Sequence, residues 1–437
     1  RCTMHGSLWW SCAIVTGKPY TVRAGHCPHD TDLAGVLAGL RTVTEPLEAA
    51  WARLEAAEHI AIKANIVWPP QHYRRHAGRA QELVDEDVLR ATLILLRERC
   101  QGQITVIDSS LTHDQHDFYF LDLLAEYGVG FINVNDAPAR WVAPPGGGAA
   151  FAQYLIPEPV LAADALVSLC TLKSHAFMGL TLSTKNLFGL CPVGERNRPR
   201  VYYHHIVRMP YFLADLADIC RPTLNIVDGL VAQSGIEWGG DPLVTNCLLA
   251  GDQTLATDLC GAQMMGHDPL GDFPSPPFRR DRNPLLIAAQ RGQGPASMDE
   301  IDFQHDLTLP VGAFDSNATD PPERVAAWHA TMAEEALAYE ADPSPYYEQY
   351  AGEYILLQGG RVLWHNPRYE LGFGSRRNLP GADPGRAIWF KYVDPSEAEA
   401  ERYGIYRREL LGSGNNTSPS SDSKSATSTT SAVAGGA

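Results

Sequence analysis

Long hydrophobic runs are absent from this sequence of 437 residues. No apolar stretch approaches the roughly 20 residues that a membrane-spanning helix needs. The stretch Leu8–Val15 is too short for that purpose, and it lacks the basic flank and the small-residue cleavage site of an export signal. We therefore expect a cytoplasmic protein without a membrane segment. Because the chain begins at Arg1 rather than Met, a signal upstream of it stays an open alternative.

Positive charge is also scarce, since 35 Lys and Arg residues stand against 51 Asp and Glu residues, for a formal net charge of -16. General binding of nucleic acid needs a basic face that neutralises phosphates, so this composition disfavours it. A local basic pocket for a small anionic substrate or cofactor remains compatible with the overall charge. Composition leaves open whether the protein forms an oligomer.

The nine cysteines form no C-x-x-C pair and no four-cysteine ferredoxin spacing, so we expect no iron–sulfur cluster. Their odd number and irregular spacing are typical of a reduced, cytosolic protein. Several lie in apolar stretches, where a buried thiol is expected: Cys170, Cys220, Cys247 and Cys260.

Four widespread catalytic motifs are missing as well. The sequence has no Walker-type phosphate loop, no G-x-G-x-x-G, no H-E-x-x-H and no G-x-S-x-G. Their absence weighs against P-loop NTPases, standard dinucleotide enzymes, zinc proteases and α/β-hydrolases.

Short apolar runs alternate with helical patterns in the first two thirds of the chain. Continuous apolar runs are typical of strands covered on both faces, and their alternation with helices predicts a parallel sheet. The predicted fold class is therefore α/β, a mostly parallel sheet with helices on both faces. The predicted strands are His59–Val67, Gln103–Asp108, Gly130–Asn135, Ala165–Leu172, Leu224–Asp228 and Cys247–Gly251. The predicted helices are Glu86–Arg99, Phe118–Tyr127, Met209–Cys220 and Thr254–Met265.

After about residue 270 the texture of the sequence changes. Residues 271–325 are rich in Pro, Asp and Arg and are predicted to be irregular. Beyond them we expect helices at Val325–Tyr339 and Pro395–Leu411, and a β-hairpin at Glu353–His365 that turns at two glycines.

These features divide the chain into four parts. We predict an N-terminal segment that joins the sheet (1–56), an α/β core (57–270), a smaller C-terminal α+β appendage (271–411) and a disordered tail (412–437). The tail is predicted to be disordered because it is rich in Ser, Thr, Gly and Ala and nearly devoid of large apolar residues.

Polar residues follow several of the predicted strands, and in parallel sheets function gathers at the carboxyl ends of strands. The residues at these positions are Lys63 and Asn65 after the first strand, Asp108 after the second, Lys173, Ser174 and His175 after the fourth, Asp228 after the fifth, and Gly251 and Asp252 after the sixth.

The densest group of polar residues is Lys173–Gly189, which combines two lysines, a histidine, hydroxyl residues and glycines directly after a strand. His175 and Lys185 are the predicted catalytic core. On one continuous helix they would lie on different faces, so they can meet only if the chain bends, for which Gly179 is the natural place. An imidazole can ligate a metal or move a proton, and a partly desolvated lysine can act as a nucleophile or covalent anchor. The alternative is that the lysines are surface charges and His175 is a core histidine.

A second group follows about twenty residues later at Tyr202–His205. His204 and His205 are further catalytic candidates, of which at most one is expected to face the site if they lie on a strand. His175 and His205 are the candidate metal ligands. The arginines at 196, 198 and 200 could bind an anion or be solvated.

Acidic and polar residues elsewhere leave two interpretations open. Asp228 before Gly229 is the better site candidate, whereas Asp252 is expected to cap a helix. A group at His113, Asp114 and His116 could supply acid–base groups or metal ligands, but a polar loop is the favoured interpretation.

Five segments of the chain resemble the family called domain of unknown function 362, over about residues 57–270. They are Ile62–Asn65, Thr171–His175, Gly179–Gly189, Val227–Gly229 and Leu249–Asp252. Many members of that family carry ferredoxin-type clusters, for which this chain lacks the cysteines. The loop Ser234–Gly240 also departs from the Glu-Gly-x-Gly-Pro run that is common there.

The spacing of His175, Gly179 and Lys185 is similar to that in lactate racemase and its relatives. That resemblance implies a nickel-pincer nucleotide attached to Lys185, with His175 and one of His204 and His205 around it. The glycines that flank the lysine in racemases are Ser183 and Thr184 here.

Two functions follow as hypotheses. The first is an enzyme with a His/Lys centre, an isomerase, racemase or redox enzyme that acts on a small hydroxy or carboxylic acid with a metal or cofactor. The second is a non-catalytic protein that binds an anion or metal for a partner, and an assembly role of the appendage is a third. The expected ligand-binding residues are Lys63, Asn65, Lys173, Ser174, Thr181, Asn186 and Asp228.

Overall fold

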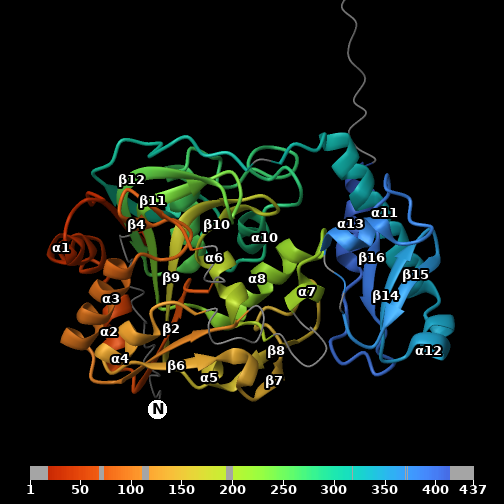
Figure 1. Ribbon diagram of the computed structural model, residues 1–437, viewed down its shortest axis with the longest axis horizontal. Helices are drawn as coiled ribbons and strands as arrows, with labels where there is room; N and C mark the ends of the chain where they lie inside the picture. Colours follow the sequence, from red (N-terminus) through yellow and green to blue (C-terminus); the bar gives the residue numbers. More distant parts are fainter. Residues whose placement is uncertain are drawn as a thin grey trace, which may run out of the picture.

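A nine-stranded sheet forms the centre of the protein in the computed structural model, which describes residues 18–67, 73–110, 118–192, 200–316, 318–369, 371 and 373–413. The strand order is β13-β1-β12-β11-β9-β2-β5-β6, with β10 paired to β9. All neighbours on the path from β11 to β6 are parallel, whereas β12 is antiparallel to both β11 and β1. The predicted mostly parallel α/β sheet is therefore confirmed (Figure 1).

The strands of the main sheet are β1 (Tyr20–His26), β2 (His59–Ala64), β5 (Gln103–Asp108), β6 (Gly130–Asn133), β9 (Ala165–His175), β10 (Gly179–Thr181), β11 (Leu224–Ser234), β12 (Asp241–Gly251) and β13 (Ile301–His305). Two short ladders pair β3 (Arg75–His76) with β4 (Arg79–Ala80) and β7 (Ala139–Val142) with β8 (Tyr154–Pro157). The helices of this main body are α1 (Leu33–Thr44), α2 (Glu48–Ala56), α3 (Glu86–Arg99), α4 (Leu121–Glu126), α5 (Glu158–Leu161), α6 (Ser183–Asn186), α7 (Arg200–Tyr203), α8 (Arg208–Cys220), α9 (Thr254–Met264) and α10 (Pro284–Gln290).

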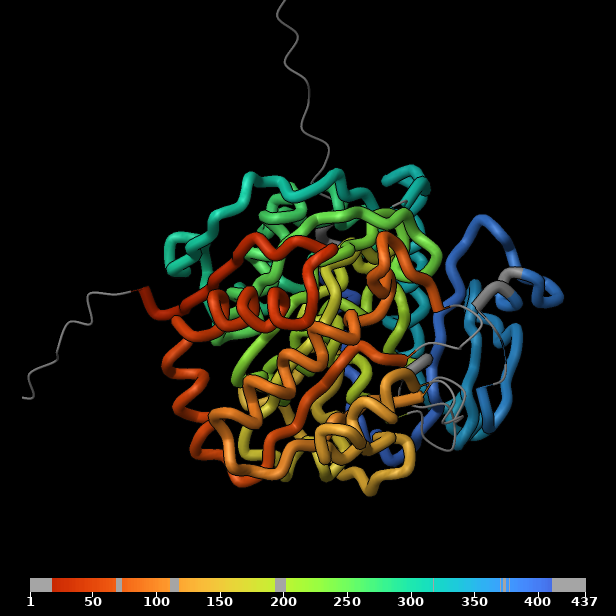
Figure 2. The backbone as a smooth tube through the Cα atoms, turned by 60° about the vertical axis from the view of Figure 1, so that its left-hand side comes forward, coloured from red at the N-terminus to blue at the C-terminus, as the bar shows by residue number. Residues whose placement is uncertain are grey.

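Two hydrophobic cores lie on the two faces of the sheet. Along β2, Ile60 and Ile62 belong to one core and Ala61 to the other, as the two-residue period of a strand requires. Helices α1 to α4 contribute to the first core, and α8, α9 and α10 to the second. Figure 2 shows the red and orange helices packed side by side over the first face. Both faces of the sheet are covered, which explains why its strands are continuously apolar.

Several strands run further than their apolar cores predict. Strand β9 continues through Lys173 to His175, and β11 continues past Asp228 to Ser234. Because β12 is antiparallel, Gly251 and Asp252 lie at the opposite edge of the sheet from Lys173, so placing them with the site was wrong. Asp252 is also not the helix cap, since Gln253 caps α9.

The C-terminal unit is a three-stranded antiparallel sheet with helices beside it. Its order is β15 (Arg361–Asn366), β14 (Tyr354–Gln358) and β16 (Trp389–Tyr392), and its helices are α11 (Pro322–Ala341), α12 (Ser344–Tyr350) and α13 (Gly404–Ser413). The predicted hairpin is confirmed, and both turn glycines, 359 and 360, have positive φ.

Two boundaries in this half differ from the prediction. The helix expected at Pro395–Leu411 begins only at Gly404, because Glu397 and Ala400 have positive φ, which a helix does not allow. The segment expected to be irregular contains α10 and β13, and β13 pairs with β1 in the main sheet. The tail from 414 lies outside the described residues.

A buried ion cluster fastens the C-terminal unit to the main body. The Glu401 carboxylate lies 2.8 Å from Arg208 on α8 and 2.9 Å from Lys391 on β16. Burial opposes its charge, but Arg208 and Lys391 outweigh burial and lower the pKa of Glu401 to about 2. Removing one member would leave an uncompensated buried charge, so the cluster sets the position of the C-terminal unit.

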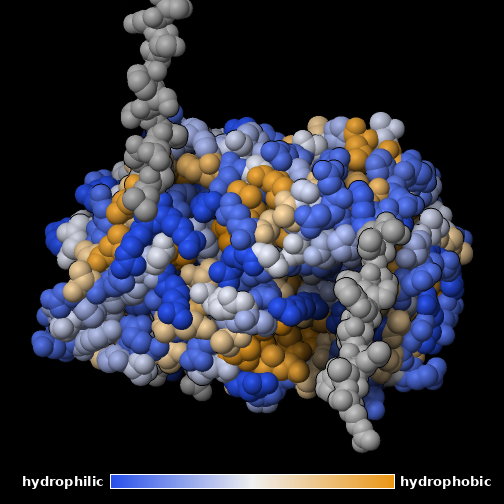
Figure 3. All heavy atoms as spheres, turned by 180° about the vertical axis from the view of Figure 1, so that it is seen from behind, coloured by the Kyte–Doolittle hydropathy of each residue, from blue (hydrophilic) through white to orange (hydrophobic). Residues whose placement is uncertain are grey.

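The outer surface is mainly polar. Seen from behind, hydrophilic residues cover most of the molecule, and hydrophobic ones gather in separate patches (Figure 3). In the part of the chain that the structure describes, no helix combines the length and the apolarity needed to cross a membrane.

Candidate active site

The chain folds back on itself directly after β9. Gly179 pairs with His175 and Thr181 with Lys173 in an antiparallel ladder, after a turn of three residues. Gly179 has φ +78°, and a Cβ there would lie 2.8 Å from the carbonyl oxygen of Pro277. Both facts require glycine. The predicted bend at this position is confirmed, and it brings the segment with Lys185 back toward His175.

Helix α6, which carries Lys185, is held by a carboxylate from helix α9, which packs against it. Asp258 on α9 accepts hydrogen bonds from the backbone amides of Ser183 at 2.8 Å and Thr184 at 2.7 Å. Burial raises the pKa of Asp258 to about 6, although these hydrogen bonds lower it. No local pattern indicates that Asp258, which lies 73 positions after Lys185, caps this short helix.

A cavity of about 970 Å³ opens at this edge of the sheet. The main body contributes three histidines, 175, 204 and 205, and all three predicted lysines, 63, 173 and 185. The C-terminal unit contributes the opposite wall, through Trp328, Met332, Arg376 and Arg386 among others. The cavity therefore lies between the two parts of the molecule.

His175 faces this cavity as a neutral imidazole. The backbone amides of Phe177 and Met178 donate to its Nδ1 atom at 3.1 and 3.2 Å. The two amides share the single lone pair of an unprotonated Nδ1, so the proton of the neutral ring lies on Nε2. Burial lowers the pKa of His175 well below its usual range, and the charges of Lys185 and Lys173 lower it further.

His204 is the second imidazole of the site. Its ring centre lies 6.1 Å from that of His175 and 5.0 Å from that of Phe177. Burial lowers the pKa of His204 to about 3, with further contributions from Lys185 and His175. His204 therefore meets the expectation that one of the two adjacent histidines lies beside His175.

His205 also lines the cavity, but toward the C-terminal unit. Its ring centre lies 6.3 Å from that of Phe390, and burial followed by Arg208 and Arg376 lowers its pKa well below the usual range. The two histidines follow α7 in a bend rather than a strand, so both can reach the cavity. The ring placed next to His175 is that of His204, not of His205, which we predicted as its metal-binding partner.

Each of the two site lysines lies over an aromatic ring. The Nζ atom of Lys185 is 4.4 Å from the centre of Phe188, and that of Lys173 is 4.4 Å from the centre of Trp238. Lys173 also donates to the backbone oxygen of Glu82 at 2.8 Å. Burial lowers the pKa of Lys173 to about 8. Its amine is thus partly neutral near physiological pH.

Lys63 is held in a tight polar cluster at the base of the cavity. Its Nζ atom lies 3.0 Å from the Asp108 carboxylate and 3.1 Å from the side-chain oxygen of Asn186. The Asn186 amide donates in turn to the backbone oxygen of Lys63 at 2.9 Å. A Cβ at Gly189 would lie 2.3 Å from Lys63 Cε, so a larger residue there would force the buried Lys63 side chain to shift. The cluster ties β2, β5 and α6 together.

The remaining predicted ligand-binding residues divide into two groups. Asn65 and Thr181 line the cavity. Ser174 does not, because successive side chains of β9 point to opposite faces and Lys173 and His175 take the cavity side. The Ser174 hydroxyl is buried and has no hydrogen-bond partner among the described residues.

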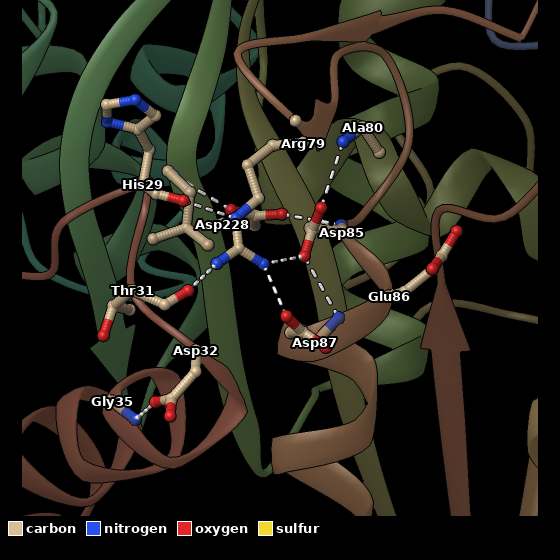
Figure 4. A network of polar contacts seen from close by, with 12 residues as sticks. His29, Thr31, Asp32, Gly35, Arg79, Ala80, Asp85, Glu86, Asp87 and Asp228 are labelled. Atoms are coloured by element: carbon tan, nitrogen blue, oxygen red, sulfur yellow. Dashed lines mark hydrogen bonds and ion pairs between the residues drawn. The ribbon is translucent and has the colours of Figure 1, made fainter.

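Asp228 lies outside the cavity lining, in a buried network on β11 (Figure 4). Its carboxylate accepts from the backbone amide of Asp85 at 2.8 Å, and Asp85 pairs with Arg79 at 2.8 Å. Arg79 also donates to the backbone oxygens of His29 and Thr31. Asp228 therefore connects β11 to the segment before α3, which corrects its predicted role in ligand binding.

Other predicted residues cannot be placed. His113, Asp114, His116 and the arginines at 196 and 198 lie outside the described residues, as does the side chain of Arg200. Conversely, the sequence offered no local signal for Trp328, Arg376 and Arg386, because they lie in the C-terminal unit far from the motif. The sequence marks the loop residues Glu237 and Trp238 only through a departure from a family pattern.

The described residues do not supply a complete ligand set for a metal ion held by His175. Ligation through Nε2 would place the ring proton on Nδ1, which lies 3.5 Å from the Glu237 carboxylate but also faces the amide donors of Phe177 and Met178. Within the described residues, no group of three or more His, Cys, Asp or Glu side chains is placed to hold a metal ion.

Comparison with known proteins finds a family match over part of the chain. Residues 60–263 match the family described as Domain of unknown function (DUF362). The thylakoid-associated protein sll1697 of Synechocystis sp. is 24% identical over 248 residues, which cover 54% of this chain and 72% of that protein.

Among solved structures, the lactate racemase apoprotein from Thermoanaerobacterium thermosaccharolyticum is 13% identical, with a TM-score of 0.33 over 56% of each chain. This chain thus spans little more than half of the racemase. At this level of likeness, the racemase carries no argument about the chemistry of this chain. The resemblance to the first family is confirmed: residues 60–263, which hold His175, Lys185 and His204, form a DUF362 domain.

Proposed function

We propose that this protein is an enzyme that moves a proton at a carbon next to the carboxylate of an organic anion, as an isomerase or racemase does. One observation carries the proposal. Two neutral imidazoles, His175 and His204, lie beside Lys185 in a cavity large enough to enclose a ligand. Neutral imidazoles are suited to general acid–base catalysis.

The charge of the cavity favours an anionic ligand. Among the described residues, six Lys and Arg line it against three Asp and Glu, although the whole chain has a formal net charge of -16. Three of the six already have carboxylate partners: Lys63 pairs with Asp108, Arg280 with Asp320 and Arg386 with Glu334. Lys173 and Lys185 lie on the wall that carries the imidazoles, where they can bind a carboxylate.

The imidazoles would take different roles. His175 presents an N–H from Nε2 and can donate a hydrogen bond to a carbonyl or carboxylate oxygen on which charge develops. His204 can accept a proton from carbon. Its pKa is lowered by burial and by Lys185, so an anion bound to Lys185 would raise it and make His204 a better base.

A group attached to Lys185 remains a separate hypothesis. The amine of Lys185 lies in a cavity with room for a large organic group, but no group of three or more His, Cys, Asp or Glu side chains among the described residues is placed to hold a nickel ion. No step proposed here uses such a group. The intact mass and metal content of protein purified from its natural host would reveal an adduct.

Proton exchange with solvent tests the proposal. Lactate and mandelate are incubated with the full chain in D2O, and loss of the proton next to the carboxylate is followed by NMR. We expect exchange that falls about 100-fold in His204→Gln. The control His365→Gln, at an exposed histidine, should exchange at the wild-type rate.

A non-catalytic anion-binding protein is the second candidate, because the same cationic cavity would serve it. This candidate predicts that carboxylates bind and that Lys185→Met weakens binding, but that neither lactate nor mandelate exchanges its proton. That combination would reject the enzyme.

A further inference from the structure

The cavity is much larger than a small hydroxy acid. Its volume is about 970 Å³, at the upper end of the roughly 300–1,000 Å³ of pockets that hold drug-sized ligands. A six-atom acid such as lactate displaces only about three water molecules, at about 30 Å³ each. Most of the cavity would then stay filled with water. Its size therefore indicates a ligand with a body of its own.

Aromatic side chains from separate segments line the cavity: Phe177, Phe188, Trp238 and Trp328. Lysine ammonium groups cover two of them, since Lys185 lies over Phe188 and Lys173 over Trp238. Phe177 after β9 and Trp328 on α11 are both partly exposed and come from the two different walls. They can provide apolar surface for a flat ring system.

Cations line both walls of the cavity. Lys173 and Lys185 belong to the main body, and Arg376 and Arg386 belong to the C-terminal unit. A ligand with a single anionic group could use only one of these pairs. A ligand with an anionic group at each end would use both.

Arg376 is held in a fixed position. Its Nε atom donates to the Tyr369 hydroxyl at 2.6 Å, and its guanidinium lies 4.9 Å from the ring centres of Tyr369 and Phe390. Only 9% of the residue is exposed, and burial lowers its pKa. A preorganised, poorly hydrated guanidinium gains more from an anion than a solvated one does.

We propose that the cavity binds a flat aromatic dianion, with one anionic group at Lys173 and Lys185 and the other at Arg376 and Arg386. The inference rests on the proposed function, because it takes the same cavity as the active site. The C-terminal unit then selects the ligand through Arg376 and Trp328, while the imidazoles act on the end that lies in the main body.

Calorimetric titration of the full chain tests the ligand class with three probes. They are biphenyl dicarboxylate with both carboxylates in para positions, biphenyl monocarboxylate, and lactate. We expect the dicarboxylate to bind at least tenfold more tightly than the monocarboxylate, and lactate to bind most weakly.

Substitutions then assign the two walls. Arg376→Gln should weaken the dicarboxylate at least tenfold and leave the monocarboxylate within twofold, whereas Trp328→Ala should weaken both biphenyl probes. Arg368→Gln is the matched control, because Arg368 is exposed and lies outside the cavity lining. If thermal melting shows that Arg376→Gln is unfolded, Arg386→Gln replaces it, since its side chain is 46% exposed. We expect a threefold loss for the dicarboxylate alone.

Three results would overturn the inference: lactate binding as tightly as the dicarboxylate, no binding of any probe, or an equal loss of both biphenyl probes in the arginine variant. Its failure can be told apart from that of the proposed function. If lactate binds best and exchanges its proton in a manner that depends on His204, only the ligand class is wrong. If the dicarboxylate binds best but no acid exchanges a proton, only the catalytic proposal is wrong.

Discussion

The imidazole rings of His175 and His204 have their centres 6.1 Å apart, although one ends a strand of the main sheet and the other follows a short helix. Lys185 lowers the pKa of both, so its charge acts on the two rings together. Three residues distant in the sequence therefore share one electrostatic environment. The predictions below follow from this environment and from the contacts that build it.

Lys173 should react faster with small electrophiles than Lys391, a buried lysine that is paired with Glu401. Burial lowers the pKa of Lys173 to about 8, whereas the charge of Glu401 outweighs burial and raises that of Lys391. Cyanate modifies neutral amines, so at pH 8 we expect carbamylation of Lys173 and not of Lys391 in a mass-spectrometric peptide map. Equal labelling of the two lysines would show that Lys173 has an ordinary pKa.

Gly189→Ala should destabilise the base of the cavity. The added Cβ would lie 2.3 Å from Lys63 Cε and 2.5 Å from the Asp108 carboxylate, which are themselves buried and paired. We expect the free energy of unfolding to fall by about 1–3 kcal/mol in urea denaturation. At Gly404 an added Cβ meets no atom within 4 Å, so Gly404→Ala should change little. A matching loss in both variants would mean that the cluster at Lys63 is not tightly packed.

His329 should make the protein less stable as the pH rises above neutral. Its Nδ1 atom lies 3.1 Å from the Glu409 carboxylate and its Nε2 atom 2.9 Å from the backbone oxygen of Arg280. Burial opposes the charge, but Glu409 and Asp281 outweigh burial and raise the pKa of His329 from 6.5 to about 9.

A pKa that is raised in the folded state stabilises the fold below the unfolded value, and this stabilisation disappears as the pH passes the folded value. The contribution should therefore be complete below pH 6.5 and lost between pH 6.5 and about 9. We expect wild-type stability to fall by about 1–3 kcal/mol over that window, and His329→Gln to show a smaller slope. If the wild type and His329→Gln lose stability with pH at the same rate, a group other than His329 causes the pH dependence.

The sequence predicts the strands of this fold well because both faces of the sheet are covered. Strand β9 is buried at every residue, and α3 matches its prediction because Asp85 caps its start and a wide apolar stripe faces the core. The direction of β12 could not be read in this way. Its apolar run is equally compatible with parallel and antiparallel pairing, and only the neighbours β11 and β1 decide.

The site is predictable where its geometry is local. Gly179 forces the chain to reverse, and the reversal places Thr181 opposite Lys173 and returns α6 toward His175. Asp228 was misassigned because an Asp after apolar residues looks like a strand end, whereas β11 continues past it and its carboxylate holds Asp85. The wall formed by Arg376 depends on how the C-terminal unit docks, and the buried Glu401 cluster that fixes it joins residues almost 200 positions apart.

Nitrogen-15 NMR of the imidazoles tests the central claim most directly, with spectra of His175 and His204 recorded between pH 4 and 8 in the presence and absence of a carboxylate. Without ligand, we predict that both rings stay neutral at pH 5, that His175 carries its proton on Nε2, and that Lys185→Met raises the pKa of His204. With the carboxylate bound, the pKa of His204 should rise in the wild type. Ordinary pKa values near 6.5 without ligand, unchanged by the carboxylate, would contradict a shared acid–base site.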